Sequence, residues 1–275
     1  MWYEKLKYYR PSKKSEVLDL MSQTVAQPIA GGTDLLVQAR TNVKRVQVFI
    51  QINHLSELSQ INFSEGKLTI GAGLTYAAYL EQAKSIFPPL TDAVTQIASP
   101  SIRNMATFGG NIVNASPAGD TLPIFYALDA ELTLESAQGI RKIPVRDFIT
   151  GPKKTILRSD ELLTEIRLNI PWNYKYSYRK IGPRKALSLS KVAFLGLYLP
   201  DNNEIRLTYA SVGPTIIRAY EAEQLYREGK SAEILDCIER RVRPITDQRS
   251  TAEYRRYLCR ALTEEFLLRT AKILV

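Results

Sequence analysis

The sequence predicts an α+β fold built from two parts, residues 1–172 and residues 173–275. Two observations support this fold class. Short strand-like runs and helical patterns occur together in each part, so each part can form a sheet covered by helices. The segment Pro171-Trp172-Asn173 interrupts these patterns and marks the boundary between the two parts.

The first part opens with a helix, because apolar residues recur at helical spacing over residues 17–21, after two serines that can cap it. Residues 46–50 form an apolar run that predicts a buried strand, and Thr75 is the expected cap of a later helix. Residues 100–120 are rich in Gly, Asn, Ser and Pro, which predicts a long irregular loop. The other expected elements are a helical turn at 53–58, a hairpin of strands 60–63 and 67–70, helices at 75–84 and 90–98, and strands at 130–134, 140–143 and 162–170.

The second part is expected to be a small three-stranded antiparallel sheet domain with C-terminal helices. Residues 176–180, 192–198 and 205–212 each predict a strand, in the order of a meander. Helical patterns follow at residues 215–228 and 232–241. The final pattern, over residues 251–273, is amphipathic along its whole length.

The composition excludes several classes of protein. A cysteine-ligated iron–sulfur cluster needs four thiolates, and this chain has only Cys237 and Cys259, which we expect to be reduced. Its single histidine, His54, excludes a metal site built from several histidines, so no metal site is expected. No apolar stretch approaches the roughly 18 residues of a membrane-spanning helix. The N-terminus lacks the apolar core of a signal peptide, so a cytoplasmic location is expected.

The net charge of +9 is unevenly distributed, because residues 171–275 carry 19 Lys and Arg against 12 Asp and Glu. A basic surface suits an acidic partner protein. Solvated helix faces, such as the one that carries Arg240-Arg241-Val242-Arg243, produce the same count and are the simpler interpretation. Neither nucleic acid nor a membrane is expected as a partner, because the chain shows no basic motif interleaved with aromatic residues and no apolar span.

Two glycine-rich segments carry most of the chemical information in the chain. They are Ala30-Gly31-Gly32-Thr33-Asp34-Leu35-Leu36 and Thr107-Phe108-Gly109-Gly110-Asn111. A Gly-Gly pair lets consecutive N–H groups converge on an anion, because no Cβ lies in the way. Two such turns predict a dinucleotide cofactor whose pyrophosphate is held between two loops. Two ordinary structural turns are the alternative, and the matched polar residues after each pair favour the cofactor site.

The first segment is expected to present the N–H groups of Gly31, Gly32 and Thr33 to the phosphate oxygens. A carboxylate beside an anion is unfavourable, so we expect Asp34 to turn back and accept N–H groups of its own loop. A binding motif of another type is not evident. The segment Gly71-Ala72-Gly73 lacks the third small residue of a Rossmann fingerprint, and neither Gly-Gly pair is followed by the Gly-Lys-Ser/Thr of a phosphate loop.

In these segments the sequence resembles the FAD-binding medium subunit of the molybdenum hydroxylases, the family of xanthine dehydrogenases and carbon monoxide dehydrogenases. The resemblance is strongest from Ile102 to Ile112 and continues through Ala115-Ser116-Pro117-Ala118-Gly119-Asp120. It implies a vanillyl-alcohol-oxidase-like (PCMH-type) FAD-binding domain over residues 1–172, followed by the family's C-terminal α+β domain over residues 173–275. The C-terminal matches are Tyr178-Arg179-Lys180-Ile181, Ser190-Lys191-Val192-Ala193 and Ser211-Val212-Gly213-Pro214-Thr215.

The resemblance also implies the residues that bind FAD. The two glycine loops would bind the pyrophosphate and adenosine region, Asp120 would contact FAD hydroxyl groups, and Leu163 would lie against the isoalloxazine ring. Lys180 would lie near the flavin, where positive charge favours the reduced, anionic form. No catalytic acid–base residue and no metal ligand is implied. The expected cofactor-binding residues are Ile29, Ala30, Gly31, Gly32, Thr33, Asp34, Leu35, Leu36, Thr107, Phe108, Gly109, Gly110, Asn111, Asp120, Leu163 and Lys180.

The function that the resemblance implies is electron transfer within a multi-subunit oxidoreductase. A molybdenum-cofactor subunit would oxidise the substrate, a subunit with two 2Fe–2S clusters would pass the electrons to FAD, and FAD would reduce NAD⁺, oxygen or another acceptor. Two alternatives stay open. A stand-alone FAD-dependent oxidase would need a substrate base, which the sequence does not show. A scaffold without flavin is disfavoured by the intact Gly-Gly pairs.

Overall fold

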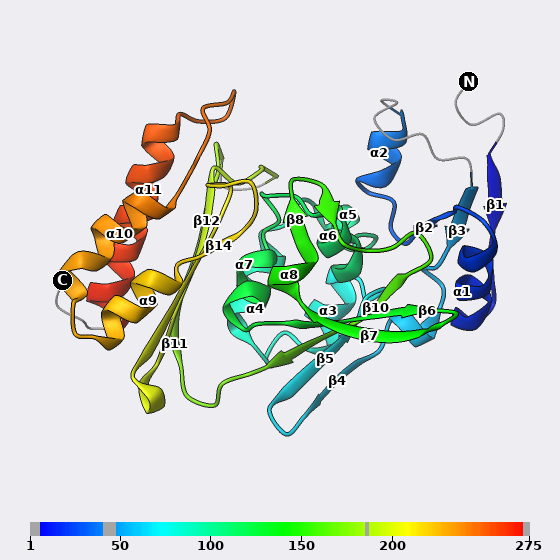
Figure 1. The fold of residues 1–275 in the computed structure, drawn as a ribbon, viewed down its shortest axis with the longest axis horizontal. Helices are drawn as coiled ribbons and strands as arrows, with labels where there is room; N and C mark the ends of the chain where they lie inside the picture. Colours follow the sequence, from blue (N-terminus) through cyan, green and yellow to red (C-terminus); the bar gives the residue numbers. More distant parts are fainter. Residues whose placement is uncertain (1–5, 41–47, 185–186, 272–275) are drawn as a thin grey trace.

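The computed structural model describes residues 6–40, 48–184 and 187–271. These residues form successive layers along the long axis of the molecule (Figure 1). A parallel three-stranded sheet lies at the N-terminal end, and an antiparallel five-stranded sheet follows it. A group of helices then separates the five-stranded sheet from an antiparallel four-stranded sheet, which the C-terminal helices cover. This mixture of helices and sheets agrees with the predicted α+β class.

The N-terminal sheet has the strand order β1-β3-β2. The predicted first helix is present, and its Val17 packs with Ile50 of β3 in a small core. No serine side chain caps this helix, because Ser12 instead donates to the carboxylate of Glu16. The first two residues of the predicted strand at 46–50 lie outside the described residues. The bounds are β1 Lys7–Tyr9, α1 Lys14–Gln23, β2 Gln27–Ile29, α2 Leu35–Arg40 and β3 Val48–Gln51.

The five-stranded sheet has the order β4-β5-β10-β6-β7. Its first two strands form the predicted hairpin, which turns at Glu65 and Gly66 with φ angles of 52° and 73°. Positive φ at both turn residues matches the right-handed twist of paired strands. The bounds are η1 Ser56–Leu58, β4 Ile61–Ser64, β5 Lys67–Gly71, β6 Glu131–Ser136, β7 Gly139–Pro144 and β10 Leu162–Asn169. Between β7 and β10 lie α8 Val145–Phe148 and a small hairpin of β8 Ile149–Gly151 and β9 Lys154–Thr155.

The prediction of an irregular loop over residues 100–120 is wrong, because this segment contains two short helices. Ser99 caps α5 by accepting the N–H of Ile102, and Thr107 caps α6 by accepting the N–H of Gly110. These caps and the burial of the apolar face of α6 outweigh the low helix propensity of its glycines and asparagines. The bounds are α3 Tyr76–Gln82, which Thr75 caps as predicted, α4 Pro88–Thr95, α5 Pro100–Arg103, α6 Phe108–Asn114 and α7 Leu122–Ala127.

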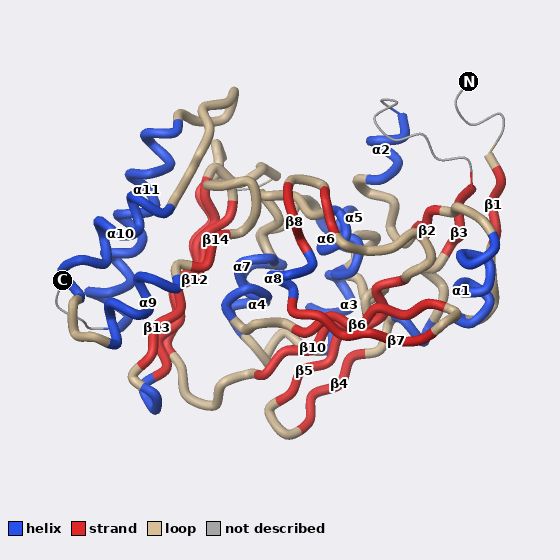
Figure 2. The backbone as a smooth tube through the Cα atoms, in the orientation of Figure 1, coloured by secondary structure: helices blue, strands red, loops and turns tan. Residues whose placement is uncertain are grey.

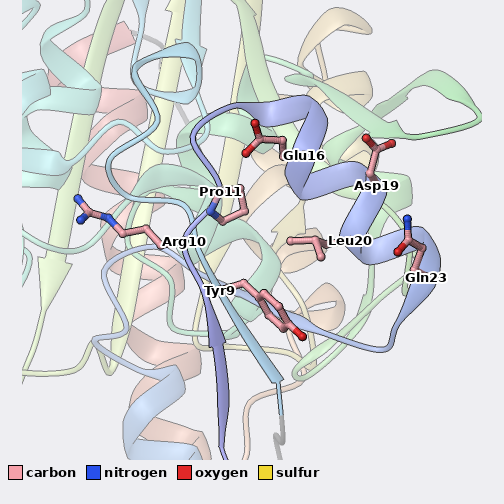
Figure 3. A pocket seen from close by; sticks show the side chains of 7 residues that line it. All are labelled: Tyr9, Arg10, Pro11, Glu16, Asp19, Leu20 and Gln23. Carbon is pink, nitrogen blue, oxygen red and sulfur yellow. The ribbon is translucent and has the colours of Figure 1, made fainter.

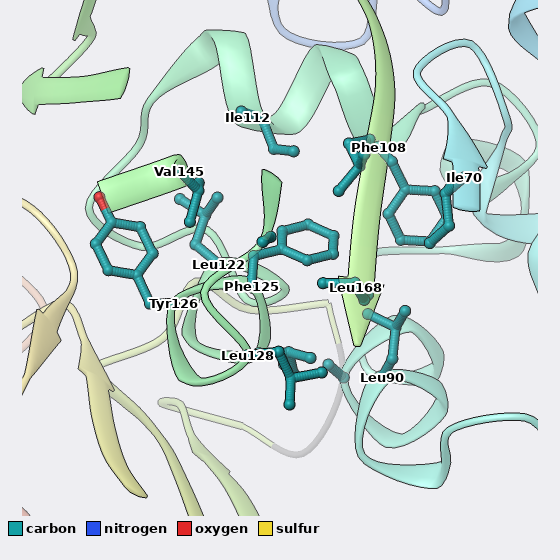
Figure 4. Close-up of a cluster of buried hydrophobic side chains, with 14 of the residues drawn as sticks. Ile70, Leu90, Phe108, Ile112, Leu122, Phe125, Tyr126, Leu128, Val145 and Leu168 are labelled. Carbon is teal, nitrogen blue, oxygen red and sulfur yellow. The ribbon is translucent and has the colours of Figure 1, made fainter. Parts of the chain in front are cut away.

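The main hydrophobic core joins the five-stranded sheet to these helices. Figure 4 shows Ile70 and Leu168 of the sheet facing Phe108 of α6 and Phe125 of α7. The ring of Phe108 lies 4.8 Å from that of Tyr76 and 6.1 Å from that of Phe125, both edge to face. Because Phe108 is fully buried, its side chain fixes the position of the second glycine segment on the sheet.

The C-terminal sheet has four strands in the order β11-β12-β13-β14, so the predicted three-stranded sheet is incomplete. The predicted helix at 215–228 also begins too early. Residues Ile217–Arg218 pair with Thr208 and Tyr209 as β14, and the helix α9 begins only at Tyr220. The β-branched residues Thr215, Ile216 and Ile217 favour extended backbone, which explains both differences. The bounds are β11 Lys175–Ile181, β12 Val192–Leu199, η2 Pro200–Asn202, β13 Glu204–Ala210, β14 Ile217–Arg218 and α9 Tyr220–Arg227.

The two faces of this sheet belong to two different cores. Along β12, Ala193 and Leu195 face the main core, whereas Val192 and Phe194 face a second core beneath the C-terminal helices. In Figure 2 the sheet accordingly lies between α4 and α7 on one side and α9 to α11 on the other. This packing brings β11 close to the loops of the first part. The helical bounds are η3 Ser231–Glu233, α10 Ile234–Arg241, α11 Ala252–Glu265 and a π-helical turn at Phe266–Ala271.

Candidate functional site

The two glycine segments lie directly against each other. A Cβ on Gly31 would be 1.8 Å from the carbonyl oxygen of Met105, just before the second segment, so only glycine fits this contact. The second segment is itself tied to β5 and the loop after it, because Gly109 donates to the carbonyl of Ala72 at 2.8 Å. The tertiary structure therefore brings together the two segments that the sequence analysis paired.

The first segment keeps a row of hydrogen-bond donors unused. Within the described residues, the backbone N–H groups of Gly31, Gly32 and Thr33 donate to no other group of the chain. Gly32 has a φ of +67°, a left-handed conformation that favours glycine. Consecutive N–H groups in such a turn form a concave anion site. These three N–H groups are therefore available as donors to an anionic ligand.

The second segment does not form a matching anion site, so the prediction of two such turns is wrong in this respect. Phe108 donates its N–H to Leu74 at 3.2 Å, and Gly110 donates to the Thr107 hydroxyl at 3.1 Å. Gly109 is needed for packing instead, because a Cβ there would be 2.6 Å from the Cβ of Ala72. The helix cap uses the N–H of Gly110, and the close contact with the loop after β5 uses the N–H of Gly109. The sequence pattern reveals neither acceptor.

Gly110 differs from Gly109 in being exposed to solvent. A Cβ at Gly110 would meet only the hydroxyl oxygen of Thr107, at 2.9 Å, within 4 Å. Gly110 is exposed, whereas Thr107 and Phe108 are buried, so the latter two hold the loop in place from below. Asn111 accepts a hydrogen bond from Thr121 through its side-chain oxygen at 2.9 Å. The second segment thus offers a surface without side chains where a ligand can approach the backbone closely.

From the sequence, Asp34 is expected to accept N–H groups of its own loop. Among the described residues, its carboxylate accepts none of them. Its carboxylate oxygen Oδ2 instead lies 2.9 Å from Nζ of Lys153, which is in the β8–β9 turn, and also accepts from the side chain of Gln38. Lys153 in turn donates to Oδ1 of Asn114, at the end of α6, at 2.6 Å. A lysine that is distant in sequence neutralises Asp34, so the carboxylate does not need the local backbone.

Asp120 lies at the contact between the first part and the C-terminal sheet. Its Oδ2 accepts from Nζ of Lys180 at 2.7 Å, and its Oδ1 accepts from the hydroxyl of Ser190 at 2.5 Å. The hydroxyl of Tyr178 donates to the Asp120 carbonyl at 3.3 Å. Burial raises the pKa of the Asp120 carboxyl, and Lys180 and Ser190 oppose that rise. Lys180 also donates to the carbonyl of Gln96 at 2.9 Å.

The remaining predicted site residues divide into accessible and buried ones. Ile29 to Leu35 are partly exposed around the first turn, and Leu36 is exposed at the start of α2. Leu163 is only 4% exposed and belongs to the main core, next to an irregularity in the β10–β6 pairing. The contacts of Asn114, Lys153 and Ser190 are not evident from the sequence, because these residues meet their partners only through long-range packing.

A shallow depression of about 390 Å³ lies elsewhere, against α1 (Figure 3). Its lining includes Tyr9, Glu16 and Leu20, and none of the predicted site residues. Within the described residues, no cluster of side chains suits a metal ion, and no helix is long and apolar enough to cross a membrane.

Comparison with known proteins shows the family of this chain. Residues 4–172 match the FAD binding domain in molybdopterin dehydrogenase, and residues 172–270 match the CO dehydrogenase flavoprotein C-terminal domain. The chain therefore belongs to the family of FAD-binding subunits of molybdopterin dehydrogenases, the molybdenum hydroxylase family that includes xanthine and carbon monoxide dehydrogenases. It is an oxidoreductase flavoprotein, and its cofactor is FAD.

Two relatives align with nearly the whole chain. The sequence is 30% identical to the xanthine dehydrogenase FAD-binding subunit of Escherichia coli O157:H7 over 276 residues, which is 94% of each chain. It is 31% identical to the glyceraldehyde dehydrogenase medium chain of Sulfolobus acidocaldarius, across 96% of this chain and 97% of the relative. A structure of reconstituted CO dehydrogenase from Oligotropha carboxidovorans has the same fold, with a TM-score of 0.89, 23% identity and 98% coverage of both chains.

The described residues fit an FAD molecule. The unused N–H groups of Gly31, Gly32 and Thr33 suit the oxygens of a pyrophosphate, and the open side of Gly110 lets a ligand lie against the backbone. A carboxylate offers about four acceptor positions, of which Lys180 and Ser190 use two on Asp120, so acceptor positions remain on a side chain that is 10% exposed.

Proposed function

We propose that this chain is the electron-transfer subunit of a multi-subunit molybdenum hydroxylase. It would accept electrons from the 2Fe–2S clusters of a partner subunit and pass them to NAD⁺ or another acceptor. The observation that carries the proposal is the row of N–H donors from Gly31 to Thr33, unused among the described residues, in a loop that packs against the backbone of Met105 just before the second glycine segment. The family membership and the presence of only two cysteines support it, since the clusters must then lie on another chain.

The architecture that we propose is a PCMH-type FAD-binding domain over residues 1–172 and a C-terminal domain over residues 173–275. The main core and the second core support this division, because the second core lies entirely within the C-terminal part. The ranges of the two matched family models support the same boundary. The C-terminal sheet contributes residues to both cores, so the two domains would move as one body.

We propose roles for the residues around the cofactor. Gly31, Gly32 and Thr33 bind the pyrophosphate through backbone N–H groups, and Asp120 accepts hydrogen bonds from FAD hydroxyl groups. Lys180 compensates the charge of Asp120 and places a cation on the flavin side of the site. When bound, FAD supplies the ability to accept and release electrons, and the chain itself supplies binding and orientation.

The partners in this proposal are a molybdenum-cofactor subunit and an iron–sulfur subunit. Relatives named as medium chains or FAD-subunits, such as the carbon monoxide dehydrogenase medium chain of Hydrogenophaga pseudoflava, support a heteromeric assembly. We propose the cytoplasm as its location, because Cys237 and Cys259 are free thiols buried in the second core.

The experiment that tests the function isolates the native complex through an affinity tag on this chain. We expect flavin absorption, release of FAD on heating, and copurification of molybdenum and iron. Flavin reduction by the organic substrate should then require the partner subunits. If the isolated chain alone is reduced by that substrate, the chain is a stand-alone oxidase. If it contains no flavin and takes up none, the electron-transfer function is wrong.

A further inference from the structure

Lys153 connects three segments of the chain that are far apart in sequence. It lies between β8 and β9, which Figure 1 shows beside α6. Its ammonium contacts Asp34 at 2.9 Å and Asn114 at 2.6 Å, and its backbone N–H donates to the carbonyl of Ala115 at 2.9 Å. The side chain of Gln38 donates to the same two acceptors, Asp34 and Asn114. Lys153 thereby ties the loop that carries the unused N–H donors to the end of α6.

The backbone around this contact has an uncommon conformation. Lys153 has a φ of 60°, and Ala115, which accepts its N–H, has a φ of 48°. Left-handed conformations are unfavourable for residues with a Cβ and persist where surrounding contacts support them. The same hydrogen bond joins both residues, so the turn holds Lys153 in a defined place beside Asp34.

The charge of Asp34 is unfavourable for an anion site that ends one residue before it. The carboxylate directly follows Thr33, the last residue of the unused N–H row. Like charges at short range in a partly exposed site weaken binding, and salt only partly screens the effect. An ammonium on the carboxylate removes this repulsion. The side chains of Lys153 and Asp34 are 46% and 48% exposed, so their ion pair contributes little to stability by itself.

We propose that Lys153 is a positioning residue for FAD: by neutralising Asp34, it leaves the first glycine loop able to accept the pyrophosphate. The inference rests on the proposed binding of FAD by this loop. The β8–β9 hairpin lies outside the two glycine segments, and this inference gives it a role in ligand binding. The effect on FAD binding is electrostatic. The exposed ion pair of Lys153 and Asp34 by itself adds little to the stability of the fold.

The test is a double-mutant cycle on the full chain, with FAD affinity measured by titration of the flavin-free protein. Lys153→Met should weaken FAD binding about tenfold, which corresponds to about 1.4 kcal/mol. Asp34→Asn should change affinity less than threefold, and the double variant should recover to within about threefold of wild type, because no uncompensated carboxylate remains. The expected loss in Lys153→Met should be larger at low salt. Lys154→Met is the matched control, since Lys154 is exposed and makes no ion pair among the described residues.

Each other outcome contradicts the inference in a distinct way. An equal loss in Lys153→Met with and without Asp34→Asn would mean that Lys153 acts on the phosphate directly. Wild-type affinity in Lys153→Met would remove Lys153 from the site while leaving FAD binding intact. A wild-type chain that does not bind FAD would contradict the proposed function itself. Equal urea midpoints of the flavin-free Lys153→Met and wild-type chains separate a binding effect from unfolding.

Discussion

Lys180 donates a hydrogen bond to Asp120 at 2.7 Å, although Asp120 precedes α7 and Lys180 lies in β11 of the C-terminal sheet. The two side chains are only 7% and 10% exposed. The hydroxyl of Ser190, which lies just before β12, donates a hydrogen bond to the other carboxylate oxygen. The position of Asp120 is therefore set by the C-terminal sheet, and any group that binds Asp120 depends on the contact between the two parts of the chain.

Removal of the Lys180 ammonium should destabilise the protein strongly. Lys180→Met leaves a buried carboxylate with Ser190 as its remaining side-chain partner, and such a loss costs about 3 kcal/mol. Urea unfolding at pH 7 measures this cost. The Asp120→Asn/Lys180→Met double variant should recover part of the stability, and an equal loss in both variants would contradict this explanation.

The same variant should also respond to pH in a defined direction. Burial already raises the pKa of Asp120, and loss of Lys180 raises it further. Since the folded carboxyl then has a higher pKa than the unfolded one, the destabilisation is fully present above the folded pKa and fades as pH falls through it. Unfolding midpoints of wild type and Lys180→Met should thus converge toward acid pH.

A methyl group at Gly31 should separate the two glycine segments. The new Cβ would be 1.8 Å from the Met105 carbonyl oxygen, so the backbone must move. Gly31→Ala should lower FAD affinity more than tenfold and reduce the thermal midpoint. Gly151→Ala is the control, because a Cβ there has only Lys154 nearby, at 3.9 Å. Wild-type flavin content in Gly31→Ala would show that the contact between the loops is dispensable.

A branched side chain at Gly110 should block the ligand without unfolding the protein. A Cβ at Gly110 would displace the Thr107 hydroxyl, which caps α6, although Val has a better helix propensity than Gly. We expect Gly110→Val to remain folded with a urea midpoint lowered by the loss of this cap, which costs about 1 kcal/mol, and to be isolated with little or no FAD. Full flavin occupancy would mean that the cofactor does not approach this face of α6.

Gly196 provides a test of the opposite kind, where stability changes and binding does not. A Cβ there would be 2.6 Å from the ring of Phe266, in the second core. Gly196→Ala should destabilise the chain by about 2 kcal/mol through overpacking, measured by urea unfolding. FAD affinity at low temperature should stay within about twofold of wild type, and a large loss would indicate that the second core supports the site directly.

The sequence predicted the elements whose signals are local. The hairpin of β4 and β5, the Thr75 cap and the strands β11 to β13 follow from apolar alternation, turn residues and capping groups within a few positions. Both glycine segments were recognisable for the same reason. The helices α5 and α6 and the strand β14 were not predicted, because burial of Phe108 and the pairing of Ile217 with Tyr209 depend on distant partners.

By itself, the sequence determined that the chain carries two glycine-rich segments, too few cysteines for an iron–sulfur cluster, and a helical C-terminus on a meander sheet. The tertiary structure decided which N–H groups stay unused. Gly109 and Gly110 donate to Ala72 and Thr107, whereas the donors from Gly31 to Thr33 have no acceptor in the part of the chain that the structure describes. The tertiary structure also placed the ammonium of Lys153 beside the carboxylate of Asp34. Hydrogen-bond partners and ion pairs are set by three-dimensional proximity, which local sequence patterns do not encode.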